Sequence, residues 1–391
     1  MAVSTDPKKI KELLERGVEN IYPKKEFLEK ELLSGRQLTL YAGYDPTAPT
    51  LHIGHGITML KLRQFQDLGH KVIMLIGDYT GMIGDPTDKS AARKKLTHEE
   101  ALVNCKSYQK QASAILDFEG ANPVKIKYNS EWLGEMRASE MLELTAHFTT
   151  QQFLERDMFQ KRLAEEKPIY LHEFLYPLMQ GYDSVAMNVD GEVGGNDQTF
   201  NMLIGRDLMK DLKGKEKFVL TVKLLADDSG KKMGKSEGNM IALSDSPEDM
   251  FGKVMRWTDG MIRSGFELCT RVEVLSDKHV KAEPMKYKKL LAFEVVKTFL
   301  GEAAAKHGQE YFASVIQENE KPTDIAEIKP STYDVVTVLV ESKLVLSSSE
   351  ARRAIEQGGV KVDDTKVEDI ALKVKKGSVV QKGKRFFVKV K

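Results

Sequence analysis

Cysteine is scarce in this chain, because only Cys105 and Cys269 occur among 391 residues and they form no CxxC pair. This excludes a disulfide framework and a cysteine-based zinc site, and it favours a reducing compartment. Long apolar runs are also missing, since no stretch approaches the roughly 18 residues that a membrane helix needs. Residues 1–10 lack the apolar stretch of a signal peptide. We therefore expect a cytoplasmic protein with no membrane partner.

A charge excess of either sign is absent as well, because 59 basic side chains face 58 acidic ones and the net charge is +1. Such a chain has no general attraction to nucleic acid or to a membrane surface. The charge is unevenly placed, however. Residues 331–391 carry 13 basic and 8 acidic side chains, whereas the rest of the chain carries 46 and 50. The excess of basic residues marks this C-terminal segment as the candidate contact for any nucleic-acid or membrane partner.

The apolar pattern predicts a mainly parallel sheet. Short apolar runs alternate with helical patterns, and they cover residues 37–42, 71–77, 124–128, 183–189 and 218–225. Five such strands with crossover helices indicate an α/β domain with a Rossmann-like, doubly wound parallel sheet.

The length of the chain predicts two or three domains rather than one core. We place the α/β domain over residues 1–245, with a helical insert at about 130–180. Beyond Ser246 the pattern is helical, which predicts an all-α domain over residues 246–325. Two short helical patterns followed by strands rich in valine and lysine predict a small α+β domain over residues 333–391.

One motif runs from the first strand into the first long helix, where residues 41–55 read YAGYDPTAPTLHIGH. His52 and His55 are three positions apart, so they share one face of a helix that begins near Ile53. Gly54 lets a nucleotide approach the backbone, and both imidazoles can donate hydrogen bonds to its phosphates. The alternative is a capping turn with two incidental histidines.

A second motif follows the last predicted strand, where residues 227–236 read DDSGKKMGKS. Gly230 and Gly234 predict a mobile turn. Its lysines can close over a triphosphate and neutralise the charge on leaving pyrophosphate, which is electrostatic catalysis without a nucleophilic side chain. A solvated basic hairpin is the alternative.

The two motifs together, in this order, resemble those of class I aminoacyl-tRNA synthetases. Three further segments narrow the resemblance to the tyrosyl-tRNA synthetase family: GDPTDKSAAR at 84–93, YPLMQGYD at 176–183 and GGNDQ at 194–198. The resemblance covers about residues 35–240, and residues 333–391 resemble the S4 RNA-binding domain of bacterial members. It implies ATP-dependent activation of L-tyrosine to tyrosyl-adenylate with release of pyrophosphate, then transfer to the 3′-terminal adenosine of tRNA(Tyr).

The resemblance also implies which side chains bind tyrosine. The family places a Tyr and an Asp at the pocket floor, and these match Tyr41 and Asp183. A buried donor and acceptor at this point reject phenylalanine, and the established discrimination for this enzyme type is about 10⁵-fold. Further contacts to tyrosine are implied for Asp85, Asn129, Tyr176, Gln180 and Gln198. Tyr176 and Gln180 are four apart, so they also fit an ordinary helix interior.

On the nucleotide side, the resemblance implies a catalytic set that stabilises charge on the phosphates. No general base is needed, because the tyrosine carboxylate is already ionised at pH 7. Magnesium is expected to accompany ATP without a dedicated protein site. The implied catalytic residues are Thr47, His52, His55, Lys89, Arg93, Lys232 and Lys235. The implied ATP-binding residues are Gly43, Asp45, Gly54, Gly195, Asp197, Met233 and Ser236.

The chain departs from the family pattern at a few positions. Asn196 replaces the commoner Ser of the ribose motif, and Gly234 replaces the central Ser of the lysine motif. Glu192 stands where several relatives have Gln. It either adds negative charge near the ammonium group of tyrosine or faces solvent, and the sequence leaves both alternatives open.

The basic C-terminal segment supplies the expected RNA contacts. Arg352, Arg353 and Lys361 are candidates for binding phosphates whatever the base sequence. A solvated lysine-rich surface is the alternative. Family members are homodimers, which implies a homodimer here, with an interface within residues 135–170.

Three other functions compete with this one. A P-loop kinase is disfavoured because Asp88 occupies the position of the second glycine, and a dinucleotide oxidoreductase because Met59 interrupts its glycine pattern. A non-catalytic RNA-binding protein with the same fold is the stronger competitor. The intact histidine and lysine motifs weigh against it.

Overall fold

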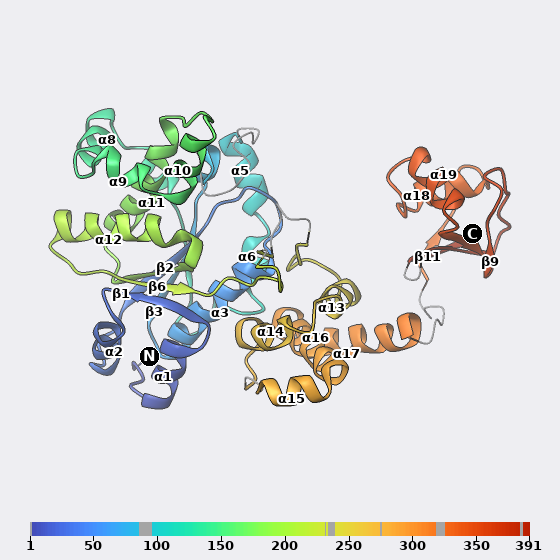
Figure 1. Cartoon of the computed structure of the whole chain (residues 1–391), viewed down its shortest axis with the longest axis horizontal. Helices are drawn as coiled ribbons and strands as arrows, with labels where there is room; N and C mark the ends of the chain where they lie inside the picture. The colour runs from blue at the N-terminus through green and yellow to red at the C-terminus, as the bar shows by residue number, and fades with distance from the viewer. Residues whose placement is uncertain are drawn as a thin grey trace. The chain divides into compact units, whose positions relative to one another are not determined.

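The computed structural model describes residues 2–85, 96–230, 232–233, 239–273, 276–317, 325–383 and 386–391. The chain forms two compact units, residues 1–305 and 306–391 (Figure 1). The predicted all-α domain falls mostly in the first unit, and the division into three domains remains a prediction. Within the described ranges, no helix combines the length and the apolarity needed to cross a bilayer.

A six-stranded sheet lies at the centre of the first unit, with strand order β1-β6-β5-β2-β3-β4. The strands are β1 (Val18–Tyr22), β2 (Thr39–Tyr44), β3 (Lys71–Ile76), β4 (Lys125–Tyr128), β5 (Gly191–Gly195) and β6 (Phe218–Val222). All neighbours pair in parallel except β1, which is antiparallel to β6 and was not predicted. The predicted α/β class with a parallel sheet is confirmed.

The strand predicted over residues 183–189 is wrong. Most of that segment completes α11 (His172–Met187), whose buried Leu178, Gly181 and Val185 are spaced as on one helix face. The true strand is β5, in which three of five residues are glycine and which therefore gives no apolar signal. Glycine is needed there: a Cβ on Gly191 would lie 2.0 Å from the ring of Phe218.

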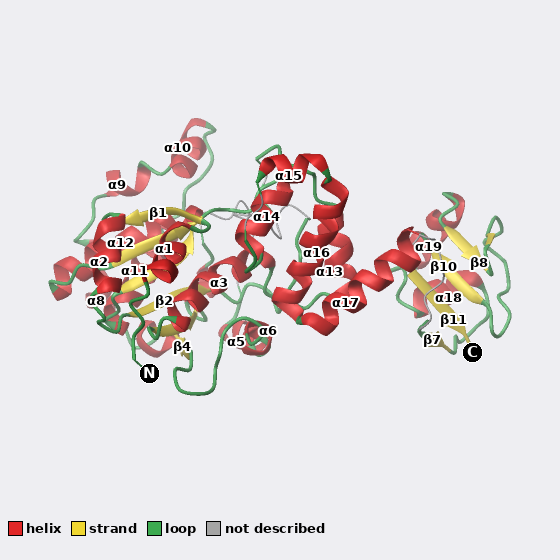
Figure 2. Ribbon diagram, turned by 90° about the horizontal axis from the view of Figure 1, so that it is seen from below, coloured by secondary structure: helices red, strands yellow, loops and turns green. Residues whose placement is uncertain are grey.

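Two crossover helices cover opposite faces of this sheet. Helix α3 (Ile53–Asp67) joins β2 to β3, and α12 (Thr199–Lys213) joins β5 to β6 in the other direction along the sheet. Right-handed crossovers in opposite directions place their helices on opposite faces. Figure 1 shows α12 on one side of the strands and α3 on the other, and Figure 2 views the same strands, in yellow, from below. The direction reverses between β2 and β5, and such a switch point is where ligands bind in open α/β sheets.

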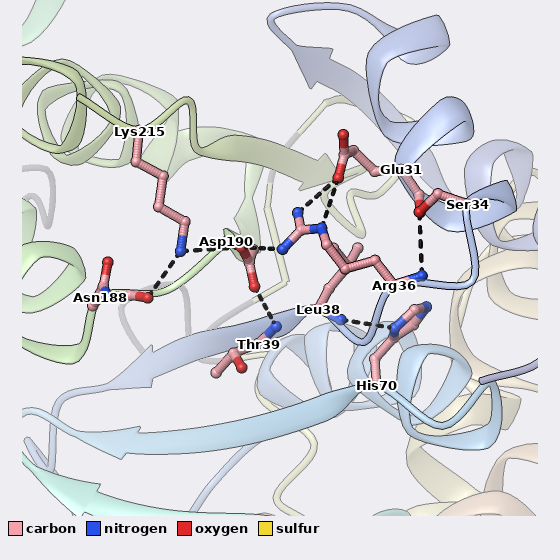
Figure 3. Close-up of polar contacts among 9 residues, drawn as sticks. All are labelled: Glu31, Ser34, Arg36, Leu38, Thr39, His70, Asn188, Asp190 and Lys215. Atoms are coloured by element: carbon pink, nitrogen blue, oxygen red, sulfur yellow. Dashed lines mark hydrogen bonds and ion pairs between the residues drawn. The ribbon is translucent and has the colours of Figure 1, made fainter. Parts of the chain in front are cut away.

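Polar contacts fix the start of β2 beside β5 (Figure 3). The carboxylate of Asp190 accepts hydrogen bonds from the backbone N–H of Thr39 at 2.7 Å and from Arg36 at 2.8 Å, and it pairs with Lys215 at 3.0 Å. These contacts hold β2 and β5 in register at their N-terminal ends.

The other helices of the first unit surround the sheet or extend from it. The N-terminal pair is α1 (Pro7–Glu15) and α2 (Lys25–Leu33). Following β3 and β4 are α4 (Thr80–Ile83), α5 (His98–Cys105), α6 (Tyr108–Ala112) and α7 (Ser130–Leu133). The insert contains α8 (Ala138–Thr145), α9 (Thr150–Leu154) and α10 (Asp157–Ala164), which Figure 1 shows grouped away from α1 and α2. Helices α13 (Pro247–Met255), α14 (Met261–Cys269), α15 (Asp277–Ala282), α16 (Pro284–Leu300) and α17 (Glu302–Tyr311) follow, before a π-helical turn at Phe312–Gln317.

The second unit combines two helices with a small sheet. Helices α18 (Val335–Glu341) and α19 (Ser348–Glu356) match the two predicted short helices. The sheet has the order β7-β11-β10-β8-β9. Its strands are β7 (Glu327–Ile328), β8 (Val360–Val362), β9 (Thr365–Lys366), β10 (Val379–Lys382) and β11 (Phe386–Val390). Valines from helices and strands form most of the core, as the valine-rich pattern requires.

Candidate active site

A cavity of about 400 Å³ opens at the C-terminal ends of the parallel strands, at the switch point between β2 and β5. The predicted site residues come from segments far apart in the sequence, and the fold brings them to this one place. Lys89, Arg93, Lys235 and Ser236 lie outside the described residues. Every other predicted catalytic, tyrosine-binding or ATP-binding residue lines the cavity: Tyr41, Gly43, Asp45, Thr47, His52, Gly54, His55, Asp85, Asn129, Tyr176, Gln180, Asp183, Gly195, Asp197, Gln198, Lys232 and Met233.

The floor of the cavity holds a phenol and a carboxyl group. Tyr41, on β2, is fully buried, and its hydroxyl lies 2.9 Å from Oγ of Ser184. Asp183, on α11, accepts hydrogen bonds from Nε1 of Trp132 at 2.7 Å and from Nδ2 of Asn129 at 3.3 Å. These two donors fix the carboxyl group and leave it as an acceptor toward the cavity.

Burial controls the protonation of both floor groups. It raises the pKa of Tyr41 well above its ordinary value, and the nearby carboxylates of Glu192 and Asp183 add to the effect. Tyr41 is therefore a neutral phenol that keeps a proton to donate. Burial also raises the pKa of Asp183, while the hydrogen bonds from Trp132 and Asn129 oppose this rise by stabilising the carboxylate. The net direction for the pKa of Asp183 is upward, so its role as the acceptor of the floor rests on geometry: Trp132 and Asn129 both donate to its oxygens, while Tyr41 keeps a proton to donate.

A second polar group surrounds Asp45, just beyond the end of β2. Its carboxylate accepts hydrogen bonds from Oγ1 of Thr80 and from the phenol of Tyr176, both at 2.8 Å. Gly77 makes this arrangement possible, because a Cβ there would lie 2.0 Å from Oδ1 of Asp45. The backbone carbonyl of Asp45 accepts from the N–H of Thr47 at 2.8 Å, which turns the chain toward the histidines.

Two amide side chains complete the wall between floor and opening. Nε2 of Gln198 donates to the carboxylate of Asp85 at 2.6 Å, and Nε2 of Gln180 donates to Oε1 of Glu192 at 3.3 Å. In the described structure Oε1 of Gln180 is buried without a hydrogen-bond partner. A buried orphan acceptor in a cavity wall fits a ligand that carries a donor, such as an ammonium group.

The two histidines stand at the start of α3 as the sequence predicts. Their rings stack with centroids 3.7 Å apart. Nδ1 of His52 accepts from the N–H of Gly54 at 3.1 Å, and Nδ1 of His55 accepts from the N–H of His52 at 3.2 Å. When Nδ1 accepts, the proton of a neutral imidazole resides on Nε2.

The electrostatic environment keeps His55 neutral. Burial lowers its pKa well below the ordinary value, and the charges of His52 and Lys232 add to this effect. Its Nε2–H is then a permanent donor rather than a titrating acid. The Cβ position of Gly54 lies 2.9 Å from the His52 ring, so a larger residue would push the pair apart.

Lys232 faces the histidines from the second motif. Its ammonium group forms an ion pair with the carboxylate of Asp197, while Met233 is buried beside it and bonds through its N–H to the carbonyl of Leu225. The histidine motif and the described part of the lysine motif therefore line one cleft. The hypothesis that both motifs contact the same triphosphate requires this arrangement.

Comparison with known proteins agrees with this geometry. Residues 33–317 match the family model for tRNA synthetases class I (W and Y), and residues 335–380 match the S4 domain. This chain belongs to the class I tRNA synthetase family. The synthetase is 42% identical to a tyrosine–tRNA ligase of Haemophilus ducreyi, over 96% of each chain. It is 43% identical to one of Geobacter metallireducens, over 97% of each chain.

A solved structure is similar to the synthetase as well. It is a C-terminally truncated mitochondrial tyrosyl-tRNA synthetase of Coccidioides posadasii, with a TM-score of 0.64 and 25% identity. The similarity covers 77% of this chain and 91% of that one.

The structure rules out one of the two alternatives for Glu192, and the other stays a prediction. Glu192 is only 2% exposed, so it does not face solvent. Its carboxylate forms an ion pair with the ammonium group of Lys217, which compensates its negative charge. Burial lowers the pKa of Lys217, whereas the partnership with Glu192 opposes that change.

Sequence reasoning missed several residues that shape the synthetase site. Trp132 follows β4 on α7, and its place after a strand that ends at the switch-point edge was a usable signal. Ser184 and Lys217 gave no signal, because a serine in a helix and a lysine before a strand ordinarily face solvent.

The candidate RNA contacts lie in the S4 unit. Arg352 and Arg353 on α19 and Lys361 on β8 are all exposed, while Ala351 and Ile355 bury the other face of the helix. In the part of the synthetase that the structure describes, no cluster of three or more His, Cys, Asp or Glu side chains is arranged to hold a metal ion.

Proposed function

We propose that this chain is a tyrosine–tRNA ligase, which activates L-tyrosine with ATP and transfers it to the 3′-terminal adenosine of tRNA(Tyr). The observation that carries the proposal is that the cavity floor holds both a hydrogen-bond donor, Tyr41, and a hydrogen-bond acceptor, Asp183. A phenol hydroxyl both accepts and donates a hydrogen bond, so it satisfies both groups. Phenylalanine leaves both unpaired, and an indole N–H only donates.

The first step joins the tyrosine carboxylate to the α-phosphate of ATP. A carboxylate oxygen attacks the α-phosphorus, the bond between the α-phosphorus and the α,β-bridging oxygen breaks, and pyrophosphate leaves with the electron pair. The step needs no proton transfer, because the carboxylate is ionised at neutral pH. Nε2–H of His52 and His55 and the ammonium of Lys232 stabilise negative charge on the phosphates, with Lys89, Arg93 and Lys235.

Substrate positioning supplies the rest of the proposed mechanism. The orphan Oε1 of Gln180 receives the ammonium group of tyrosine, together with Asp85 and Tyr176. Asp197 exchanges Lys232 for the ribose hydroxyls when ATP enters, which frees the lysine for the phosphates. In the second step a ribose hydroxyl of the tRNA attacks the adenylate carbonyl, and AMP leaves.

The remaining partners follow from the same function. Mg²⁺ accompanies ATP on its phosphate oxygens. Arg352, Arg353 and Lys361 bind tRNA phosphates from the S4 unit. The protein acts as a cytoplasmic homodimer with its interface in residues 135–170, where Leu142 and Leu163 are exposed to 72% and 49%.

The test is amino-acid-dependent exchange of labelled pyrophosphate into ATP, run with tyrosine, phenylalanine and tryptophan in parallel. Tyrosine alone is expected to support rapid exchange, and adding tRNA(Tyr) is expected to give tyrosyl-tRNA. Exchange that is equally fast with tryptophan, or no exchange with any of the three, would overturn the proposal.

A further inference from the structure

A buried ion pair adjoins the cavity, whose lining includes Glu192 but not Lys217. The side chain of Lys217, which immediately precedes β6, has no exposed surface, and that of Glu192 on β5 is 3% exposed. The ammonium group donates to Oγ of Ser184 at 2.7 Å, to the carboxylate of Glu192 and to the carbonyl of Met202 at 3.3 Å. Three acceptors match the three protons of an ammonium group, so the lysine is charged.

Stability does not account for this pair. Taking two charges out of water is costly, and replacing a buried ion pair by apolar residues of similar volume is often neutral or stabilising. The pair does not tie distant units together either, because Glu192 lies on β5 and Lys217 immediately precedes β6, the neighbouring strand. Its contacts lead instead to two side chains that line the cavity, Tyr41 and Gln180.

The first contact chain runs to the hydroxyl end of the cavity. Lys217 can only donate, so Oγ of Ser184 accepts from it. Apart from the lysine, the described partner of that oxygen is the Tyr41 hydroxyl at 2.9 Å. A hydroxyl that accepts a hydrogen bond from a cation is polarised, so its own O–H donates a hydrogen bond to the neighbouring oxygen. The Tyr41 oxygen is then an acceptor toward Ser184, so its own proton is not used by Ser184 and can be donated to a ligand in place of Glu192, the other group with which the phenol interacts.

The second contact chain runs to the opposite side of the cavity. A carboxylate accepts and never donates, so Glu192 must meet the amide nitrogen of Gln180 rather than its oxygen. This choice leaves Oε1 of Gln180 as the orphan acceptor in the wall. Lys217 also restrains Glu192 electrostatically, because an unpaired carboxylate would compete for the phenol proton of Tyr41, with which it interacts.

We propose that Lys217 is a positioning residue that sets the hydrogen-bond polarity of the tyrosine pocket at both ends. Through Ser184 it makes Tyr41 a donor toward the substrate hydroxyl. The substrate hydroxyl in turn donates a hydrogen bond to Asp183. Through Glu192 it makes Gln180 an acceptor toward the substrate ammonium. The inference rests on the proposed function and adds a determinant of tyrosine specificity that touches no substrate atom.

The test is pyrophosphate exchange by full-length Lys217→Met, measured with tyrosine and with phenylalanine. Methionine has similar volume but cannot donate. We expect the KM for tyrosine to rise about 10-fold or more, and the ratio of kcat/KM for tyrosine over phenylalanine to fall about 10- to 100-fold, since the hydroxyl loses an oriented partner. The KM for ATP is expected to stay within about 2-fold, because the triphosphate groups are contacted elsewhere.

A second variant covers the case in which an unpaired Glu192 prevents folding. Lys217→Met combined with Glu192→Gln removes both charges at nearly constant volume. We expect this variant to fold and still to show a lowered ratio of tyrosine over phenylalanine, because Ser184 and Gln180 have lost their fixed polarity. If it folds and keeps the wild-type ratio, the proposal is overturned.

The matched control is Lys61→Met. Lys61 is also buried, at 4% exposure, but its ammonium group donates to the backbone carbonyls of Leu13 and Arg16, away from the cavity. This variant is expected to lose stability without changing the ratio. An equal loss of the ratio in Lys61→Met would show that any buried lysine matters alike and would overturn the assignment.

A double-mutant cycle with Ser184→Ala tests the relay itself. Because Lys217 acts on Tyr41 through Ser184, the losses of specificity in Lys217→Met and Ser184→Ala are expected not to multiply. Fully multiplicative losses would rule out this route. Activity of the wild-type protein with tyrosine is the reference throughout, so a failure of the proposed function is recognised before any variant is compared.

Discussion

Residue by residue, specificity depends on which groups hold Asp183 in place. Trp132 and Asn129 donate to its two carboxylate oxygens. Trp132→Phe keeps a ring but removes the shorter of the two hydrogen bonds. The carboxylate loses about 1 to 3 kcal/mol of stabilisation, so the KM for tyrosine is expected to rise about 5- to 100-fold. Steady-state exchange kinetics measure this change.

The chain offers a matched control in its other tryptophan. Nε1 of Trp257 is buried without a hydrogen-bond partner in the described structure, so Trp257→Phe removes no such bond. Its KM for tyrosine is expected to stay at the wild-type value. Equal effects of the two substitutions would mean that Trp132 acts through packing rather than through Asp183.

A glycine on β2 provides the corresponding test for the nucleotide. Nothing lies within 4 Å of a Cβ built on Gly43, and the residue lines the cavity. Gly43→Val therefore fits the strand but occupies space proposed for ATP. We expect the KM for ATP to rise at least about 10-fold while the melting temperature stays equal or increases, because valine favours strands. A lowered melting temperature with an unchanged KM would contradict this placement.

At the level of helices and strands, the connection between α3 and β3 is held to the start of β2 by a hydrogen bond that depends on pH. His70 is buried there, and its Nδ1 accepts the N–H of Leu38 at 3.2 Å, at the start of β2 (Figure 3). Burial, with the nearby charge of Arg36, lowers the pKa of His70 to about 4. The unfolded chain binds a proton below about pH 6.5, so the folded state loses stability as the pH falls from there toward 4.

This loss has a definite size. Between pH 7 and pH 5 the linkage amounts to about 2 kcal/mol of unfolding free energy. Urea unfolding of the wild type and of His70→Asn at both pH values measures it, because asparagine can still accept from Leu38 but does not titrate. The wild type is expected to lose about 2 kcal/mol more than the variant. Equal losses would mean that His70 is protonated in the folded state.

At the level of helices and strands, the sequence determines much of the fold. Four of the five predicted strands and both S4 helices occur as expected, because their apolar patterns are regular. The strand over residues 183–189 failed since α11 continues into that stretch, and β5 is rich in glycine that packs against Phe218. The apolar pattern of a segment cannot reveal such a strand, because packing against the Phe218 ring requires glycine there instead of apolar side chains.

The site was easier to predict than the strands that carry it. Motif residues such as His52 and Asp183 all reach one cavity wherever the structure describes them. Their supporting residues could not be predicted, because Lys217 and Ser184 matter only through contacts between segments distant in sequence. Such contacts depend on strand order, which no single segment encodes.

For the whole molecule, two compact units predict two separable activities. Residues 1–305 contain the entire described cavity, and the S4 unit contains the candidate phosphate contacts. A chain ending at residue 317 is expected to keep tyrosine-dependent exchange within about 3-fold and to lose most tRNA charging, since the phosphate contacts supply much of RNA affinity. Exchange and aminoacylation assays on one preparation measure both.

Charge reversal in the full chain is the control for that truncation. Arg352→Glu with Arg353→Glu changes only exposed side chains of α19. It is expected to raise the KM for tRNA and leave exchange unchanged. A truncated chain that charges tRNA as well as the full chain would remove the S4 unit from the proposed function.

The account as a whole requires one cleft with two chemically distinct ends, and comparing Asp183→Ala with His55→Asn in tyrosine-dependent exchange tests it most directly. Asparagine keeps an acceptor for the N–H of His52. Asp183→Ala is expected to abolish activation of tyrosine at ordinary concentrations by raising its KM. His55→Asn is expected to lower kcat about 10- to 1000-fold with little change in the KM for tyrosine. The opposite pattern, with kcat lost at Asp183 and tyrosine binding lost at His55, would contradict the account.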